Sequence, residues 1–185
     1  MRTRSLNWSG VSRFWLFTLT GLAFFVFWIV ARPSSEMTAS MTEWPNVLWF
    51  SATLLSLAVA LPVFGRMVGG RSVVRLASIA GAGVGLSSVA NIFEDGFRID
   101  GFFAAFILGT LILDVGLLAL TIVIARTAPD RYRLLAVIPA GTAAGILLFV
   151  AAGGPIMLIT WLAAAAAALR MPSGRTPVPV APTTP

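Results

Sequence analysis

The stretch GFFAAFILGTLILDVGLLALTIVIAR, residues 101–126, decides what kind of protein this is. It carries one charged side chain, Asp114, before Arg126 ends it. An α-helix needs about 20 apolar residues to cross the ~30 Å hydrocarbon core of a bilayer. The stretch is longer than that, so it predicts a transmembrane helix.

The rest of the chain has the same character. Hydrophobic residues make up 58% and charged residues 11% of the 185 positions, and the mean hydropathy is +0.92. A soluble domain is ordinarily about 45–50% apolar and about 25% charged, so the composition predicts an integral membrane protein without a sizeable soluble domain. Its apolar segments are 14–31, 47–65, 72–92, 102–125, 134–152 and 155–170.

These segments predict an all-α membrane protein, a polytopic bundle of six transmembrane helices. Residues 1–13 are then a basic N-terminus, 14–170 the transmembrane domain and 171–185 a disordered, proline-rich tail. The first apolar run follows basic residues as in a signal peptide. It is too long for one and no small-residue cleavage site follows, so we expect an uncleaved anchor.

The last two segments are the hardest to thread. The motif Gly153-Gly154-Pro155 interrupts an otherwise overlong apolar run. About sixteen residues of helix after it would reach only ~24 Å. Residues 134–170 therefore form either two full spans or a short re-entrant hairpin. Two spans are favoured, because a helix break exposed to lipid leaves backbone groups without hydrogen-bond partners.

The arginines set the predicted orientation. All thirteen basic residues are arginine, and with six crossings only Arg32 and Arg98 fall on the side opposite to the others. Positively charged loops stay in the cytoplasm, so both termini are predicted to be cytoplasmic. The net charge of +6 follows from this topology, and nucleic acid is not an expected partner. Arginine without lysine, with abundant alanine and glycine, indicates a GC-rich genome and a bacterial plasma membrane.

Residue types that the sequence lacks exclude much chemistry. Without cysteine there are no disulfides, thiolate metal sites or cysteine nucleophiles. Without histidine the commonest general base and metal ligand is missing. No phosphate-binding, hydrolase, zinc-protease or dinucleotide motif is present. We therefore expect no enzyme activity, no cofactor and no metal.

Small residues follow one face of segment 72–92. Ser78, Gly81, Gly85 and Ser88 recur at spacings of three and four, and the two glycines form a GxxxG pair. Small residues in lipid let helix backbones approach closely. The face predicts close helix packing, either inside the bundle or by association with itself or with other membrane proteins.

Asp114 is the strongest functional candidate. Thr110, Asp114 and Thr121 lie within about 40° of one another around the helix and form a narrow polar stripe. An ionised aspartate at the bilayer centre costs about 2.5–3.5 kcal/mol on insertion scales, so it should face the bundle interior. We expect Asp114 to face segment 72–92 and to be protonated, to bond Ser78 or to pair with Arg75.

Charge also gathers in NIFEDGFRID, residues 91–100. Glu94, Asp95 and Asp100 form an acidic cluster whose oxygens would suit a hard cation. Their spacing matches no established cation loop, and Arg98 competes for the carboxylates. A solvated hairpin tip is therefore expected.

Two functions remain open. The scarcity of reactive residues favours a non-enzymatic helical bundle or an accessory subunit of a membrane assembly. The alternative is a small transporter of protons or a solute, with the carboxyl of Asp114 as its relay.

The predicted topology can be tested with single cysteines, because the chain has none of its own. Ser40→Cys and Gly96→Cys should react with a membrane-impermeant thiol reagent added outside intact cells, and Thr127→Cys should not. Strong outside labelling at position 127 would overturn the threading.

Overall fold

The computed structural model describes residues 9–30 and 43–171, and every regular element within these ranges is helical. The long helices are α1 (Gly10–Val30), α3 (Trp44–Val68), α4 (Arg71–Asn91) and α5 (Phe103–Thr127). The short α6 (Asp130–Arg133) leads into α7 (Val137–Leu147), and a break at Phe149–Gly153 precedes α8 (Gly154–Arg170). The all-helical prediction is confirmed.

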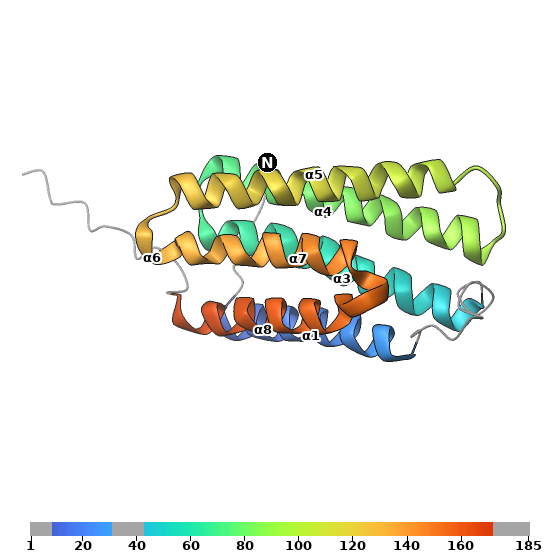
Figure 1. Cartoon of the computed structure of the whole chain (residues 1–185), viewed down its shortest axis with the longest axis horizontal. Helices are drawn as coiled ribbons and strands as arrows, with labels where there is room; N and C mark the ends of the chain where they lie inside the picture. The colour runs from blue at the N-terminus through green and yellow to red at the C-terminus, as the bar shows by residue number, and fades with distance from the viewer. Residues whose placement is uncertain (1–8, 31–42, 172–185) are drawn as a thin grey trace, which may run out of the picture.

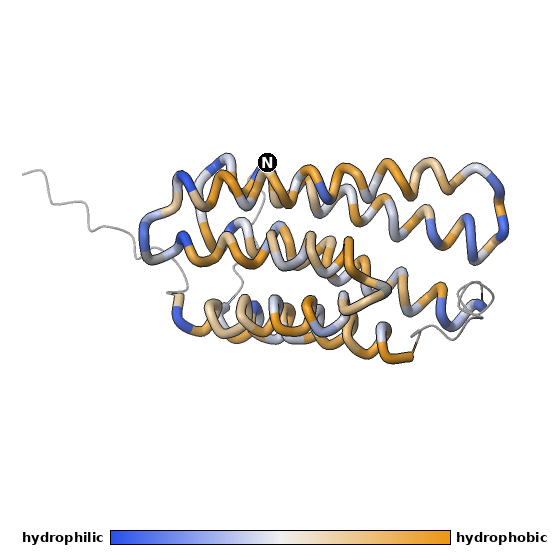
Figure 2. The backbone as a smooth tube through the Cα atoms, viewed as in Figure 1, coloured by the Kyte–Doolittle hydropathy of each residue, from blue (hydrophilic) through white to orange (hydrophobic). Residues whose placement is uncertain are grey.

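The helices lie along one axis, with α4 and α5 at one edge, α1 and α8 at the other, and α3 and α7 between them (Figure 1). Helix α8 runs antiparallel to α1, since Gly10 lies against Ala168 and Gly21 against Trp161. The middle of the bundle is largely hydrophobic, and hydrophilic residues concentrate toward its ends (Figure 2). This distribution suits a bundle within a bilayer.

Within the residues that the structure describes, five helical stretches are long and apolar enough to cross a membrane. They are α1, α3, α5, the stretch Arg71–Gly96 around α4, and the stretch Ala151–Arg170 around α8. The remaining apolar helix, Leu134–Leu147, is shorter, about 21 Å at 1.5 Å per residue. The chain is a multi-pass helical membrane protein, as predicted, but residues 134–152 do not form one long helix.

The break before α8 begins earlier than the motif Gly153-Gly154-Pro155 suggests. Leu148 (φ −98°, ψ 19°) and Ala152 (φ −149°, ψ 16°) leave the helical region, whereas Gly153 already has helical dihedrals. Pro155 lies in the first turn of α8, where its missing N–H costs nothing. The break therefore shortens the helix formed by segment 134–152 and leaves segment 155–170 helical throughout.

Glycine makes this turn possible. A Cβ atom on Gly153 would collide with the carbonyl oxygen of Gly145, so the two backbones meet directly. The turn between α7 and α8 consequently stops well short of the loop between α4 and α5 (Figure 1). The N-terminal residues 1–8 and the proline-rich tail beyond Met171 lie outside the described residues.

Helix α4 packs through small residues on two faces. Toward α3, a Cβ atom on Gly81 would lie 2.8 Å from the carbonyl oxygen of Ala58, while the nearest neighbour for one on Gly85 is the Ala58 Cβ, 3.8 Å away. Toward α5, a Cβ on Gly83 would lie 2.7 Å from the carbonyl oxygen of Gly109. The small-residue pattern in the sequence predicted the face of α4 that packs on α3, but it did not predict the second face, which packs on α5.

The two serines of the predicted small-residue face behave differently. Ser88 is buried and donates a hydrogen bond to the carbonyl of Ser51 on α3, at 2.8 Å. Ser78 is exposed and donates to the carbonyl of Val74 on its own helix. The contact with α3 thus includes Gly81 and Ser88 but leaves Ser78 outside it.

Gly83→Ala should lower the stability of the detergent-solubilised protein by about 1–3 kcal/mol, the usual cost of overpacking. The added methyl group would meet the carbonyl oxygen of Gly109 at 2.7 Å. Gly85→Ala is the matched control: its neighbour at 3.8 Å leaves room, and the gain in helix propensity is worth up to about 1 kcal/mol. Thermal unfolding followed by circular dichroism should separate the two variants. Equal destabilisation of both would contradict the close α4–α5 contact.

Candidate intramembrane polar site

Asp114 lies near the middle of α5, at the border between its buried and its lipid-facing surface. Leu113 and Leu117 are buried, whereas Val115 and Leu118 are exposed. The Asp114 side chain is partly buried, and its Oδ1 atom is fully buried without a hydrogen-bond partner. A carboxyl oxygen thus lies in the apolar middle of the bundle, and no group among the described residues forms a hydrogen bond with it.

Neither predicted partner reaches Asp114. The Ser78 hydroxyl is used by the Val74 carbonyl of its own helix. Arg75 is exposed, and the one ion pair within residues 9–30 and 43–171 joins Arg133 and Asp130 instead, at 3.1 Å. Asp114 therefore forms neither the predicted hydrogen bond to Ser78 nor the predicted ion pair with Arg75, and its protonation stays a prediction.

The rotation of α5 explains why. Gly109 and Gly116 turn toward α4, where a Cβ on Gly116 would lie 2.9 Å from the Cβ of Ala80. At 100° per residue, Asp114 lies about 150° round the helix from these glycines. Close packing of the glycines against α4 thus turns the carboxyl away from it.

The hydroxyls of the predicted stripe bond mainly to their own helix. Thr121 donates to the carbonyl of Leu117 at 2.8 Å, and Thr110 to that of Phe106 at 3.0 Å. The Thr110 hydroxyl also lies 3.2 Å from that of Ser87 on α4. None of these bonds includes Asp114, so the stripe is not a connected polar network.

A cavity of about 230 Å³ lies within one turn of Asp114, where the turn between α7 and α8 stops short. Ser87 and Thr110 supply its hydroxyls, and both donate to the carbonyl of Phe106, so they can only accept further hydrogen bonds. The rest of the lining is apolar: Phe24, Phe50, Leu54, Val84, Phe106, Leu113, Ile146 and Phe149. The cavity suits an apolar occupant better than a hydrated ion.

A second polar cluster, which the sequence did not single out, joins α3 to α4. The Asn91 side-chain amide donates to the Ser51 hydroxyl at 3.0 Å, and Ser88 donates to the Ser51 carbonyl. All three residues are buried. Asn91 therefore links α4 to α3. Asn91 lies three residues after Ser88 and therefore on the same side of the helix, which could have predicted this contact with α3.

The acidic loop caps a helix. A carboxylate oxygen of Glu94 accepts a hydrogen bond from the N–H of Phe103, in the first turn of α5, at 2.9 Å. This satisfies a donor that has no partner inside the helix. Asp100 is exposed, and no group of three metal-ligating side chains occurs among the described residues. Within the described part of the chain Arg98 forms no ion pair, and its backbone adopts a positive φ of 56°.

Aromatic rings hold the same loop. Phe93 stacks on Phe102 with ring centroids 4.8 Å apart, and Trp44 meets Phe97 edge to face at 5.1 Å. A Cβ on Gly96 would lie 2.9 Å from the Trp44 ring, so a cysteine there would be hindered. The exposed Asp100 is the better labelling position, and Ser40 lies outside the described residues.

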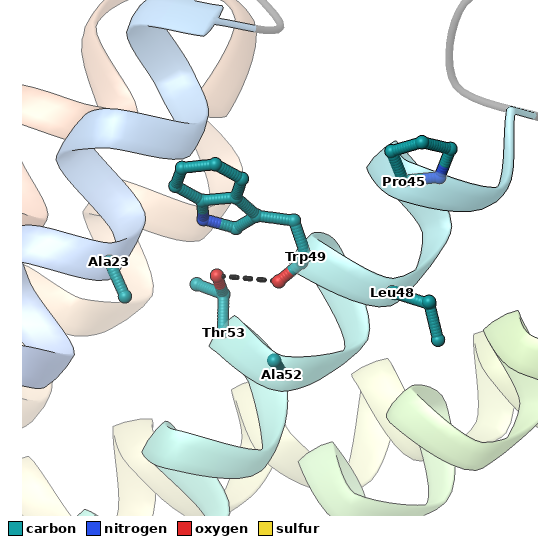
Figure 3. A pocket seen from close by; sticks show the side chains of 6 residues that line it. All are labelled: Ala23, Pro45, Leu48, Trp49, Ala52 and Thr53. Atoms are coloured by element: carbon teal, nitrogen blue, oxygen red, sulfur yellow. Dashed lines mark hydrogen bonds between the residues drawn. The ribbon is translucent and has the colours of Figure 1, made fainter.

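An open hollow on the outside of the bundle lies between α1 and α3 (Figure 3). Its lining is Ala23, Pro45, Leu48, Trp49, Ala52 and Thr53. The Thr53 hydroxyl donates to the carbonyl of Trp49 at 2.8 Å, so it is already engaged. With no convergent polar groups, the hollow resembles a lipid-facing surface and not a reactive site.

Comparison with protein-family models, with curated proteins and with solved structures finds no match for this chain. Its residues carry the functional argument alone.

Asp114→Leu should stabilise the purified protein by about 1–3 kcal/mol, because it removes a buried polar group that lacks a partner. The control is Asp130→Asn, which changes a carboxyl in an exposed surface ion pair and should leave the thermal midpoint nearly unchanged. A clear loss of stability in Asp114→Leu would mean that the carboxyl has a partner within the bundle.

Proposed function

We propose that this chain is a non-enzymatic helical bundle that works as a subunit of a larger membrane assembly. One observation carries the proposal: Asp114 places a carboxyl within the bundle's apolar middle, and the described chain offers it no partner. Ionisable residues inside a membrane usually pair with one another or with backbone groups. A group on another chain would complete this site.

A partner helix could pack on the exposed start of α5. The turn between α7 and α8 stops short of the loop between α4 and α5, so α7 and α8 do not extend as far as the start of α5 (Figure 1). Several large apolar side chains there are exposed, namely Phe103, Ile107, Leu108 and Leu111. This exposed surface at the start of α5, which we call the α5 notch, precedes Asp114 on the same helix.

The chemistry of the partner follows from the carboxyl. A transmembrane helix that brings an arginine, lysine, asparagine or glutamine to the level of Asp114 could donate hydrogen bonds to it. Such bonds between membrane helices are worth about 0.6–2 kcal/mol each. The apolar contact along the α5 notch would add packing energy.

The other polar groups support a non-enzymatic role. Within the described residues, Ser51, Ser88 and Asn91 bond to one another between α3 and α4. Ser87 and Thr110 share the carbonyl of Phe106. These groups hold helices together and do not converge on a common reacting position.

For the location we propose a bacterial plasma membrane, with both termini in the cytoplasm. In the described chain, every arginine except Arg98 belongs to the half of the bundle where α1 begins, α3 meets α4, α5 meets α7 and α8 ends. Arginine marks the cytoplasmic side of a membrane protein. Residues 134–170 could form two full spans or a short hairpin from α7 to α8. Either arrangement returns the C-terminus to the same side of the membrane.

Transport is the second candidate, and the cavity beside Asp114 is the observation that favours it. Ser87 and Thr110 could accept a hydrogen bond from a solute there, and Asp114 follows Thr110 by about one turn of α5. The predominantly apolar lining argues against an ion path.

Purification from native membranes in a mild detergent tests the assembly. Wild-type protein should copurify with a partner in fixed stoichiometry, and Asp114→Leu should lose at least half of it. Thr121→Val, on the same stripe but bonded to its own backbone, is the matched control and should retain the partner. A wild-type chain that purifies alone and carries proton flux in liposomes, with the flux abolished by Asp114→Asn, would favour transport instead.

A further inference from the structure

Helix α1 begins with a buried arginine. Arg13 is only 7% exposed although it lies within four residues of the helix start. Its Nε atom donates to the carbonyl of Ser9 at 3.4 Å, so the side chain runs back toward the beginning of the helix. Its Nη2 atom is fully buried and has no hydrogen-bond partner.

The guanidinium group lies at one end of the bundle. A Cβ on Gly10 would be 3.3 Å from the carbonyl oxygen of Ala168, close to the end of α8. We call this the basic end, and in the described chain it carries Arg13, Arg66, Arg71, Arg126, Arg133 and Arg170. The ends of transmembrane helices lie at the level of the lipid headgroups.

The electrostatics of α1 make Arg13 unfavourable on its own. The N-terminus of a helix carries about half a positive charge, which repels a nearby cation. The hydroxyl of Ser9 satisfies the N–H of Ser12 at 3.1 Å, but the N–H groups of Gly10 and Val11 have no acceptor within the helix. An anion would stabilise the guanidinium and the helix N-terminus together.

Among the described residues, no acidic side chain supplies that anion. Asp130, the one acid at the basic end in the described chain, pairs with Arg133 at 3.1 Å. Glu43, Glu94, Asp95 and Asp100 flank the opposite ends of α3, α4 and α5, and Asp114 lies midway. Glu36 falls between α1 and α3, outside the described residues. The C-terminal end of α8 is a negative pole, but Arg170 already lies in its last turn.

We propose that Arg13 and the N-terminus of α1 form a binding site for a phosphate group. A guanidinium N–H and free backbone N–H groups at a helix start are both good donors to phosphate oxygens. The phosphodiester of a lipid headgroup is present at this level of the bilayer, and free phosphate has the same chemistry. The site does not depend on the assembly proposed above.

Thermal unfolding of the purified full-length chain tests the site and identifies the source of the phosphate. Phosphatidylglycerol is compared with a diacylglycerol of the same acyl chains, which lacks the phosphoglycerol headgroup. Inorganic phosphate is compared with chloride at equal ionic strength. A larger thermal shift with phosphatidylglycerol than with diacylglycerol identifies the headgroup, and a shift with phosphate alone identifies free phosphate.

Variants then assign the effect to Arg13. Arg13→Gln should weaken binding of the phosphate-bearing ligand at least tenfold in native mass spectrometry, and Arg13→Lys should weaken it less. Arg126→Gln, exposed in the last turn of α5 at the same end, is the control and should stay within twofold of wild type.

Two outcomes would overturn the proposal. One is a wild-type protein that responds equally to the two lipids and not at all to phosphate, a result that stands even if Arg13→Gln fails to fold. The other is a folded Arg13→Gln protein that binds the phosphate-bearing ligand as tightly as wild type does.

Discussion

Close contact between helix backbones along α4 is the constraint on which the rest of the structure depends. Lipid gives helices no hydrophobic reason to associate, so packing of small residues must hold them together. Gly81 brings α4 against α3, and Gly83 brings it against α5. The second contact fixes the rotation of α5, and that rotation turns Asp114 away from α4. The carboxyl therefore lacks a partner because glycine packing between α4 and α5 fixes the rotation of α5.

The helices could be predicted because the bilayer sets their length. Apolar blocks of about 20 residues located α1, α3, α4 and α5 to within a few residues. Hydropathy could not locate the end of α7, because Leu148 and Ala152 are as apolar as helical residues and yet leave the helical region. Glycine and proline marked a break, but the side-chain pattern did not show that it began before them.

The candidate site was harder to predict than the fold. Periodicity places Thr110, Asp114 and Thr121 on one stripe, but it cannot say which neighbour the stripe faces. That depends on the rotation of α5, which Gly109 and Gly116 determine through contacts with α4. Their spacing of seven residues was a usable signal. Nothing in the sequence predicts that Arg13 is buried, because an arginine before a membrane helix normally reaches water.

The shortness of the helix Leu134–Leu147 also affects the surrounding membrane. Helices α3 and α5 each have 25 residues, about 37 Å, against about 21 Å for Leu134–Leu147. Hydrophobic mismatch costs a fraction of a kcal/mol per Å, and a bilayer relieves it by thinning. Where lipid contacts both helices, the bilayer beside α7 would have to be thinner than the bilayer beside α5. A membrane protein with such unequal sides favours thin patches of bilayer and is drawn toward neighbours that share the deformation.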